Sequence, residues 1–201
     1  MTGSRDMERH VKNRSEKLLD WRYGLVAQHI EDGGHVLDLG AGTGWVGKRL
    51  AERKGCRVQL VDVLDCNETD LPLTVYDGKT IPAPDKSVDV VTLVFVLHHA
   101  VNQEQILTEA ARVARRRIVV VEDTPKNWLE LGIDRTCDAF MSLEHGFYNP
   151  ATYRNVSQWR RVFDNLGFAV EHEQVIKPFF PFYYTKAVFA LDARRGPAAG
   201  K

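Results

Sequence analysis

The sequence contains little cysteine and no excess of either charge. Its three cysteines, Cys56, Cys66 and Cys137, lie far apart and form no Cys-x-x-Cys pair, so we expect neither a zinc site nor a disulfide framework. Lys and Arg together number 27, and so do Asp and Glu. Because a chain without a positive field does not gather a polyanion, no nucleic-acid partner is expected.

Long apolar runs, internal repeats and low-complexity linkers are also missing. No run reaches the length of a membrane span, and residues 1–17 are polar and lack the apolar core of a secretory signal. These absences predict a cytoplasmic protein with no membrane contact. At 201 residues the chain is expected to form one domain over residues 1–193, with residues 194–201 as a disordered tail.

Apolar periodicity divides the rest of the chain into helices and strands. Residues 8–30 repeat apolar side chains at helical spacing, so one or two helices precede the first strand. The alternation that follows predicts a doubly wound parallel sheet whose ligands lie beyond the carboxyl ends of the strands. The expected strands cover residues 36–39, 58–63, 73–76, 88–97, 118–121, 169–176 and 186–191, and the later helices cover residues 45–54, 103–114 and 157–166.

The most informative segment is HVLDLGAGTGW at residues 35–45. It reads as a buried strand that ends in an acid and continues directly into a turn with glycine at alternate positions. Glycine has no Cβ and adopts positive φ at little cost, so a ligand can lie against the backbone of such a turn. The segment therefore indicates a cofactor-binding loop.

The pattern Asp-x-Gly-x-Gly-x-Gly, at Asp38, Gly40, Gly42 and Gly44, resembles motif I of the class I S-adenosylmethionine (AdoMet) dependent methyltransferases. The resemblance implies an α/β, Rossmann-like doubly wound sheet of about seven strands, mostly parallel with an antiparallel C-terminal strand, and helices on both faces. It also implies that the chain binds AdoMet, releases S-adenosylhomocysteine and methylates O, N, C or S of a small molecule, as a monomer or a homodimer. The N-terminal helices (residues 1–32) and an insert at residues 124–153 are expected to select this acceptor.

Two other functions remain open. Residues 42–47 also satisfy the Gly-x-Gly-x-x-Gly pattern of a Rossmann-type NAD(P)-dependent oxidoreductase. In that fingerprint the first glycine follows the strand directly, whereas here residues 38–41 intervene, and the carboxylate of Asp38 would repel a pyrophosphate. A scaffold subunit that binds AdoMet without transferring its methyl group is the second alternative.

Carboxylates at two further strand ends are candidates for holding the cofactor. Asp62 ends the second strand, where an acid can accept both ribose hydroxyls, and Asp65 takes this role if the strand end lies a few residues later. Asp77 precedes a glycine after the third strand and can accept from the adenine amine, although Asp-Gly is also a common turn. The cofactor positions that the resemblance implies are Asp38, Gly40, Ala41, Gly42, Gly44, Asp62, Val63, Asp77, Gly78 and Leu97.

His98 and His99 follow the fourth strand, where the transferable methyl group is expected to point. Imidazole has a pKa near 6.5 and is mostly a free base at neutral pH, so either residue is a candidate catalytic base. Small-molecule members of the family often carry Leu-His-His here, as residues 97–99 do. Because adjacent residues leaving a strand point to opposite sides, we expect unequal roles, with His99 the more important.

The acceptor is expected to contact Glu122, after the fifth strand, and Phe147 and Tyr148 of the insert. Asp123 and Asn127 lie near Glu122 and suggest a magnesium site. No acid stands beside His98, however, so the oxygen ligands of a hard cation are incomplete and no metal is expected.

Overall fold

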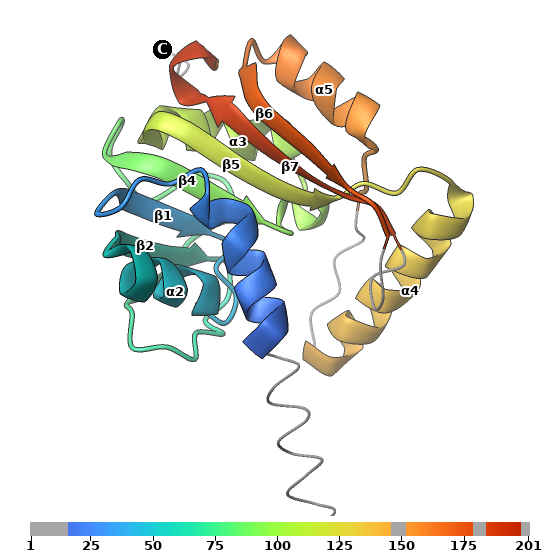
Figure 1. The fold of residues 1–201 in the computed structure, drawn as a ribbon, viewed down its shortest axis with the longest axis horizontal. Coiled ribbons are helices and arrows are strands. Elements are labelled where there is room, and N and C mark those ends of the chain that lie inside the picture. Colours follow the sequence, from blue (N-terminus) through green and yellow to red (C-terminus); the bar gives the residue numbers. More distant parts are fainter. Residues whose placement is uncertain (1–15, 146–151, 179–183, 198–201) are drawn as a thin grey trace, which may run out of the picture.

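The computed structural model describes residues 16–145, 152–178 and 184–197, with side chains for residues 16–136, 152–178 and 184–197. Its centre is one sheet of seven strands in the order β3-β2-β1-β4-β5-β7-β6 (Figure 1). All neighbouring pairs from β3 to β5 are parallel, whereas β7 runs antiparallel to both β5 and β6. The expected mostly parallel sheet with an antiparallel last strand is therefore confirmed. The strands are β1 (His35–Leu39), β2 (Arg57–Asp62), β3 (Leu73–Val75), β4 (Val88–Val94), β5 (Ala114–Asp123), β6 (Ala169–Ile176) and β7 (Lys186–Asp192).

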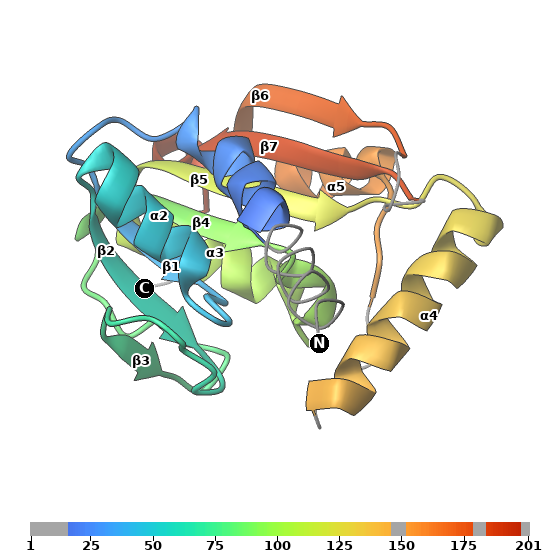
Figure 2. The same ribbon diagram turned by 60° about the horizontal axis from the view of Figure 1, so that its bottom comes forward.

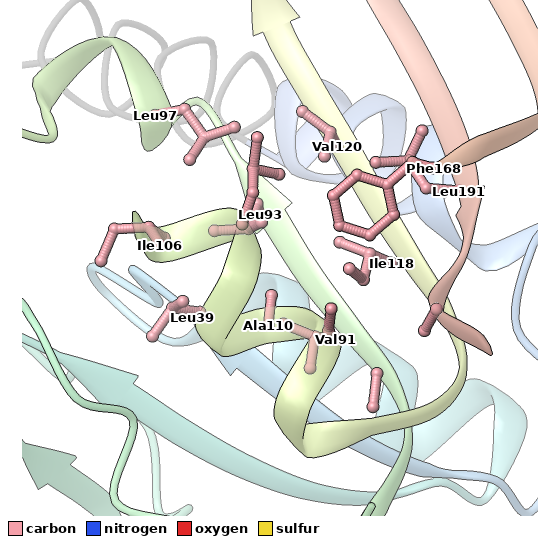
Figure 3. Packing of buried hydrophobic residues seen from close by; sticks show 14 of the residues in the cluster. Leu39, Val91, Leu93, Leu97, Ile106, Ala110, Ile118, Val120, Phe168 and Leu191 are labelled. Carbon is pink, nitrogen blue, oxygen red and sulfur yellow. The ribbon is translucent and has the colours of Figure 1, made fainter. Parts of the chain in front are cut away.

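Helices cover both faces of the sheet, as Figure 2 shows. A helix at residues 16–27 and α2 (Trp45–Lys54) pack on one face, where Leu50, Val58 and Val119 share a buried cluster. On the other face α3 (Gln103–Val113) and α5 (Val156–Asn165) pack against β1, β4, β5 and β7. Figure 3 shows Ile106 and Ala110 of α3 against the strand residues of this second cluster. The sheet is thus buried on both sides, which fixes its carboxyl edge as the exposed place for ligands.

Local sequence signals set the helix ends. The α2 helix spans the expected residues and stops at Gly55, which takes a φ of +63° as its C-cap. Asn155 and Gln158 form a capping box that starts α5 at Val156, one residue before its expected beginning. The remaining helix, α4 (Trp128–His145), lies in the expected insert and stands to one side of the sheet beyond β5.

Two strand boundaries differ from the sequence-based expectation by three or more residues. β4 ends at Val94, because Phe95 takes a φ of +59° and residues Leu97–His99 form a 3-10 turn, η1. β5 begins at Ala114, so Arg115, Arg116 and Arg117 are strand residues and not the end of a helix. Each of these arginines is neutralised by an acid, namely Asp89, Glu31 and Glu171.

The described chain is folded beyond Arg194, where a disordered tail was expected to begin. Ala193–Arg195 form a second 3-10 turn, η2, and Arg194 Nε donates to Asp192 Oδ1 at 2.8 Å. None of the described helices combines the length and the apolarity that crossing a bilayer requires.

Candidate functional site

The turn between β1 and α2 contains three glycines in the left-handed region. Gly40, Gly42 and Gly44 have φ angles of +70°, +53° and +79°. A Cβ on Gly40 would lie 2.4 Å from Val96 Cγ2, and one on Gly44 would lie 2.5 Å from Asn67 Oδ1, so other parts of the protein occupy both spaces. A Cβ on Gly42 would meet no atom within 4 Å. Gly42 is therefore the position where the loop backbone faces open space, as a cofactor lying against it requires.

Asp38 supports this turn from beneath. Its side chain is 2% exposed, Oδ1 accepts from the Thr92 hydroxyl at 2.7 Å, and the backbone N–H of Gly47 also donates to it. Burial, with a smaller contribution from the charge of Asp62, raises the pKa of Asp38 to about 6. The side chain thus joins β1 to β4 and α2. The burial of Asp38 does not favour the direct contact with the cofactor that the sequence predicts.

Asp62 connects the end of β2 to the glycine turn. Its Oδ2 accepts from the backbone N–H of Gly42 at 2.7 Å, and its Oδ1 accepts from Val63 and Leu64 at 2.6 and 3.2 Å. A carboxylate has about four acceptor sites, so one remains beside these three bonds. Asp65, the alternative, accepts from the backbone of Asn67.

The turn after β3 lies beside this group. Asp77 accepts from the backbone N–H groups of Lys79 and Thr80 at 2.8 and 2.9 Å, and these bonds lower the pKa of its carboxyl group. Gly78 has a φ of +74°, and a Cβ there would lie 3.3 Å from Val63 Cγ1. The structure therefore brings together the ends of β2 and β3 in the way the sequence predicts, although Asp77 already fills a turn role.

Glu122, at the end of β5, holds η1 in place. It is fully buried, and its Oε1 accepts from the backbone N–H groups of Val96 and Leu97 at 2.9 and 2.6 Å. Its Oε2 lies 2.6 Å from His98 Nδ1. Both backbone bonds fall on Oε1, so Oε2 is left to accept from the histidine, and we assign a proton to His98 Nδ1. These bonds fix η1 and His98 on Glu122, and the expected contact of Glu122 with substrate stays a prediction.

The two histidine rings lie close together, with centroids 4.1 Å apart and ring planes tilted by 48°. Because they belong to a 3-10 turn and not to an extended strand, their side chains do not point to opposite sides as expected. Tyr153 stacks on His98 at 5.2 Å, and the backbone N–H of Thr152 donates to the carbonyl of His98 at 2.7 Å. His98 is 2% exposed and His99 is half-buried, so His99 is the more accessible of the pair.

The turn η1 also contacts the glycine turn. Val96, which precedes η1, places its side chain in the space beside Gly40. Leu97 is fully buried in the core, so it supports the site from within and does not line open space. The candidate cofactor loop and the candidate catalytic pair are therefore neighbours.

Asp123 forms a buried ion pair with Lys186 at the beginning of β7, with Nζ to Oδ1 at 2.7 Å. Burial raises the pKa of Asp123. Across the described residues, no group of three or more His, Cys, Asp or Glu side chains is placed to hold a metal ion. Phe147 and Tyr148 lie outside the described residues.

The sequence did not reveal the roles of Tyr153, Phe95 and Lys186. Tyr153 and Lys186 are distant in sequence from the motifs that they approach, so no spacing rule identifies them. Phe95 has a positive φ, but it lies in an apolar segment that reads as a continuous strand, so the sequence does not predict this conformation. The sequence signal for an early strand end was the length of the expected strand at residues 88–97, which exceeds that of its neighbours.

The strand order and the glycine turn at the carboxyl edge define a Rossmann-like cofactor-binding domain. A family model described as a methyltransferase domain matches residues 37–120. The ubiquinone/menaquinone biosynthesis C-methyltransferase UbiE of Burkholderia mallei is 32% identical over 119 residues, which cover 51% of this chain and 49% of that protein. The chain thus spans about half the length of the curated relatives it matches.

Solved structures agree on the fold. A chain from the complex between the Haloferax volcanii Trm112 methyltransferase activator and a methyltransferase has a TM-score of 0.66 at 20% identity, covering 93% of this chain and 96% of that one. The [4+2]-cyclase SpnF has a TM-score of 0.65 at 12% identity, covering 91% and 81%. Over residues 37–120 the chain is thus similar to the methyltransferase domain, whose class I members use AdoMet as cofactor, and the solved structures share its Rossmann-like fold.

Replacing Gly40 by Ala tests the close approach of η1 to the glycine turn. We expect a loss of about 2–4 kcal/mol in the free energy of unfolding without ligand, from left-handed strain and overlap with Val96. Gly24 is the control, because it lies in the N-terminal helix with nothing within 4 Å of a Cβ, so Gly24→Ala should stabilise by about 0.5–1 kcal/mol. Urea denaturation measures both, and equal stability of Gly40→Ala and the wild type would contradict the contact.

The raised pKa of Asp38 predicts a specific pH dependence. Folding raises this pKa from 3.8 to about 6, so the native state holds the extra proton and its stabilisation is present below pH 3.8. It is lost as the pH rises through about 6, a change of about 3 kcal/mol. Denaturation at pH 4 to 7 should show this slope in the wild type relative to Asp38→Asn, and parallel curves for the two proteins would count against it.

Proposed function

We propose that the protein transfers the methyl group of AdoMet to a small-molecule acceptor at the carboxyl edge of the sheet. The observation that carries the proposal is the contact between the glycine turn and η1, which brings the candidate cofactor loop beside a buried Glu-His pair and a second histidine. AdoMet supplies an electrophilic methyl group on a sulfonium. The protein must then align a nucleophile with it and exclude water.

The residues at the cofactor end fit this ligand. Open space beside Gly42 leaves its backbone approachable, and Asp62 is fixed next to it with acceptor capacity for a ribose hydroxyl. Asp77, Gly78, Val63 and Ala41 complete the proposed surface for the nucleoside. Asp38 acts on this surface indirectly, by fixing the turn from beneath.

At the acceptor end we assign the two histidines different roles. Glu122 holds His98 with its proton on Nδ1, and Tyr153 covers the His98 ring, so His98 is a positioning residue. His99 has the accessible ring and is the proposed base, taking a proton from an acceptor that needs activation. An acceptor that is already a good nucleophile requires only alignment from the same groups.

The identity of the acceptor depends on segments outside the family match. The matched residues end at 120, before the insert at residues 124–153 that we propose to select the acceptor. The relative named for quinone biosynthesis makes a ring carbon in a hydroquinone-like acceptor one possibility to test. The cyclase among the structural neighbours shows that a shared fold does not fix the reaction.

We further infer a single domain over residues 1–193, acting in the cytoplasm on a small molecule as a monomer or homodimer and without a nucleic-acid partner. The equal numbers of acidic and basic residues support the last point, because polynucleotide binding needs several phosphate contacts and a basic surface.

Calorimetric titration tests the cofactor class. AdoMet and S-adenosylhomocysteine should bind the wild type, whereas NADPH should not. Asp62→Ala should weaken AdoMet binding by about 1.5–3 kcal/mol, because it removes a charged acceptor and releases the glycine turn. Asp65→Ala is the matched control and should bind normally. Tight binding of NADPH, or a loss confined to Asp65→Ala, would move the assignment elsewhere.

Single alanine substitutions separate the two histidines. His98→Ala should lower the free energy of unfolding by about 2–4 kcal/mol, because it leaves the Glu122 carboxylate buried with one partner fewer. His99→Ala should keep normal stability but reduce turnover of AdoMet to S-adenosylhomocysteine, measured with a pool of small metabolites, by about 100-fold or more. His172→Ala, on exposed β6, is the control. Two small and equal losses of turnover would leave the base unidentified and oppose our assignment.

A further inference from the structure

Arg22, in the N-terminal helix, is a half-buried cation without a counter-ion of its own. Its Nε is buried, and its guanidinium makes no hydrogen bond or ion pair with any residue in the described part of the chain. Burial lowers the pKa of Arg22, because the loss of hydration outweighs the opposing charges of Asp123 and Tyr184. Other arginines of the chain do reach carboxylates, including Arg49, Arg112, Arg116, Arg117, Arg160 and Arg194.

The carboxylate that acts most strongly on Arg22 already pairs with another cation. Asp123 is the carboxylate that acts most strongly on Arg22, but its Oδ1 accepts from Lys186 at 2.7 Å. Lys186 and Arg22 therefore share one close carboxylate, and Arg22 lowers the pKa of Lys186 further. Asp134 also acts on Lys186, and the phenol of Tyr184 acts on Arg22.

Both cations lie over one strained aromatic residue. The Arg22 guanidinium and the Lys186 ammonium are each 5.5 Å from the centroid of the Phe95 ring, and Trp21 stacks on Phe95 at 6.3 Å. Phe95 has a φ of +59°, a conformation that costs energy in a residue other than glycine. Phe95 directly precedes Val96, which packs on Gly40, so the cluster stands next to the glycine turn.

The N-terminal helix is anchored so that Arg22 is fixed in place. Asp20 and Glu16 of this helix both pair with Arg49 of α2, and Leu25 and Val26 are buried against the sheet. A guanidinium that is held rigidly with unused donors is preorganised for a planar, bidentate anion.

We propose that Arg22 binds a carboxylate in the candidate site, either the amino-acid carboxylate of AdoMet or a carboxylate on the acceptor. The inference rests on the proposed function. It extends that function by naming a carboxylate as the group that either the acceptor or the methionine end of AdoMet presents to Arg22. Within the described ranges Arg22 has no ion-pair partner, and in this proposal the ligand supplies one.

Calorimetry and thermal melting of Arg22→Met test this inference, with Arg22→Lys as a second variant. The control is Arg53→Met, since Arg53 also lies over an aromatic ring, that of Tyr23 at 5.2 Å, but pairs with Asp20. The probes are AdoMet, S-adenosylhomocysteine and decarboxylated AdoMet, and benzoate and benzamide in the presence of S-adenosylhomocysteine. Arg22→Met without ligand should melt at or above the wild-type temperature, because it removes an uncompensated cation.

The two carboxylate sources give different results. If the cofactor supplies the carboxylate, Arg22→Met weakens the binding of AdoMet and S-adenosylhomocysteine by about 10–100-fold and leaves the binding of decarboxylated AdoMet unchanged. If the acceptor supplies it, cofactor binding is unchanged, and the wild type binds benzoate but not benzamide, a preference that Arg22→Met loses. In both cases Arg22→Lys retains part of the affinity and Arg53→Met behaves as wild type.

Arg22→Met with unchanged cofactor affinity and no loss of benzoate binding would overturn the assignment, as would a lowered melting temperature without any change in ligand affinity. Failure of the wild type to bind any AdoMet derivative would instead overturn the proposed function. The Arg22 assignment would then stand or fall on the benzoate and benzamide titrations made without cofactor.

Discussion

The carboxylate of Glu122 is the interaction on which the rest of the site depends. Three N–H groups converge on it, two from the backbone before and within η1 and one from His98. These bonds end β4 early and turn the chain sharply. Because Val96 then packs beside Gly40, the same carboxylate sets the distance between the cofactor loop and the histidines. A single buried carboxyl group thus organises two surfaces, and its burial is compensated by hydrogen bonds within a short segment.

Much of the fold could be predicted from the sequence because its signals are local. The strand before the glycine turn, the helix at residues 45–54 and the late hairpin all follow from apolar spacing and from glycine at fixed places. The end of β4 could not be predicted, since it is set by a carboxylate on another strand, 26 residues beyond Val96. The start of β5 at Ala114, four residues before the expected strand, could not be predicted for a similar reason, because Arg116 and Arg117 pair with Glu31 and Glu171, which are distant in sequence.

The candidate site shows the same division. Gly42 and Asp62 were expected at the cofactor and lie together in the structure, since motif spacing determines both. Asp38 and Glu122, which we expect to contact ligands, are both buried and bond to other parts of the protein. Sequence spacing identifies which strand ends meet, whereas the direction of each side chain depends on packing from elements that no motif describes.

Because β7 runs in the opposite direction to β5, its first residue lies at the edge of the sheet where the parallel strands end. In the parallel strands only the last residues reach the ligand edge, but in β7 the first residue, Lys186, does so beside Asp123 at the end of β5. The last residue of β6, Ile176, pairs with Lys186, so the end of β6 lies at this edge as well. One strand inversion thus brings a cation from the start of a strand to an edge that otherwise receives only the ends of strands.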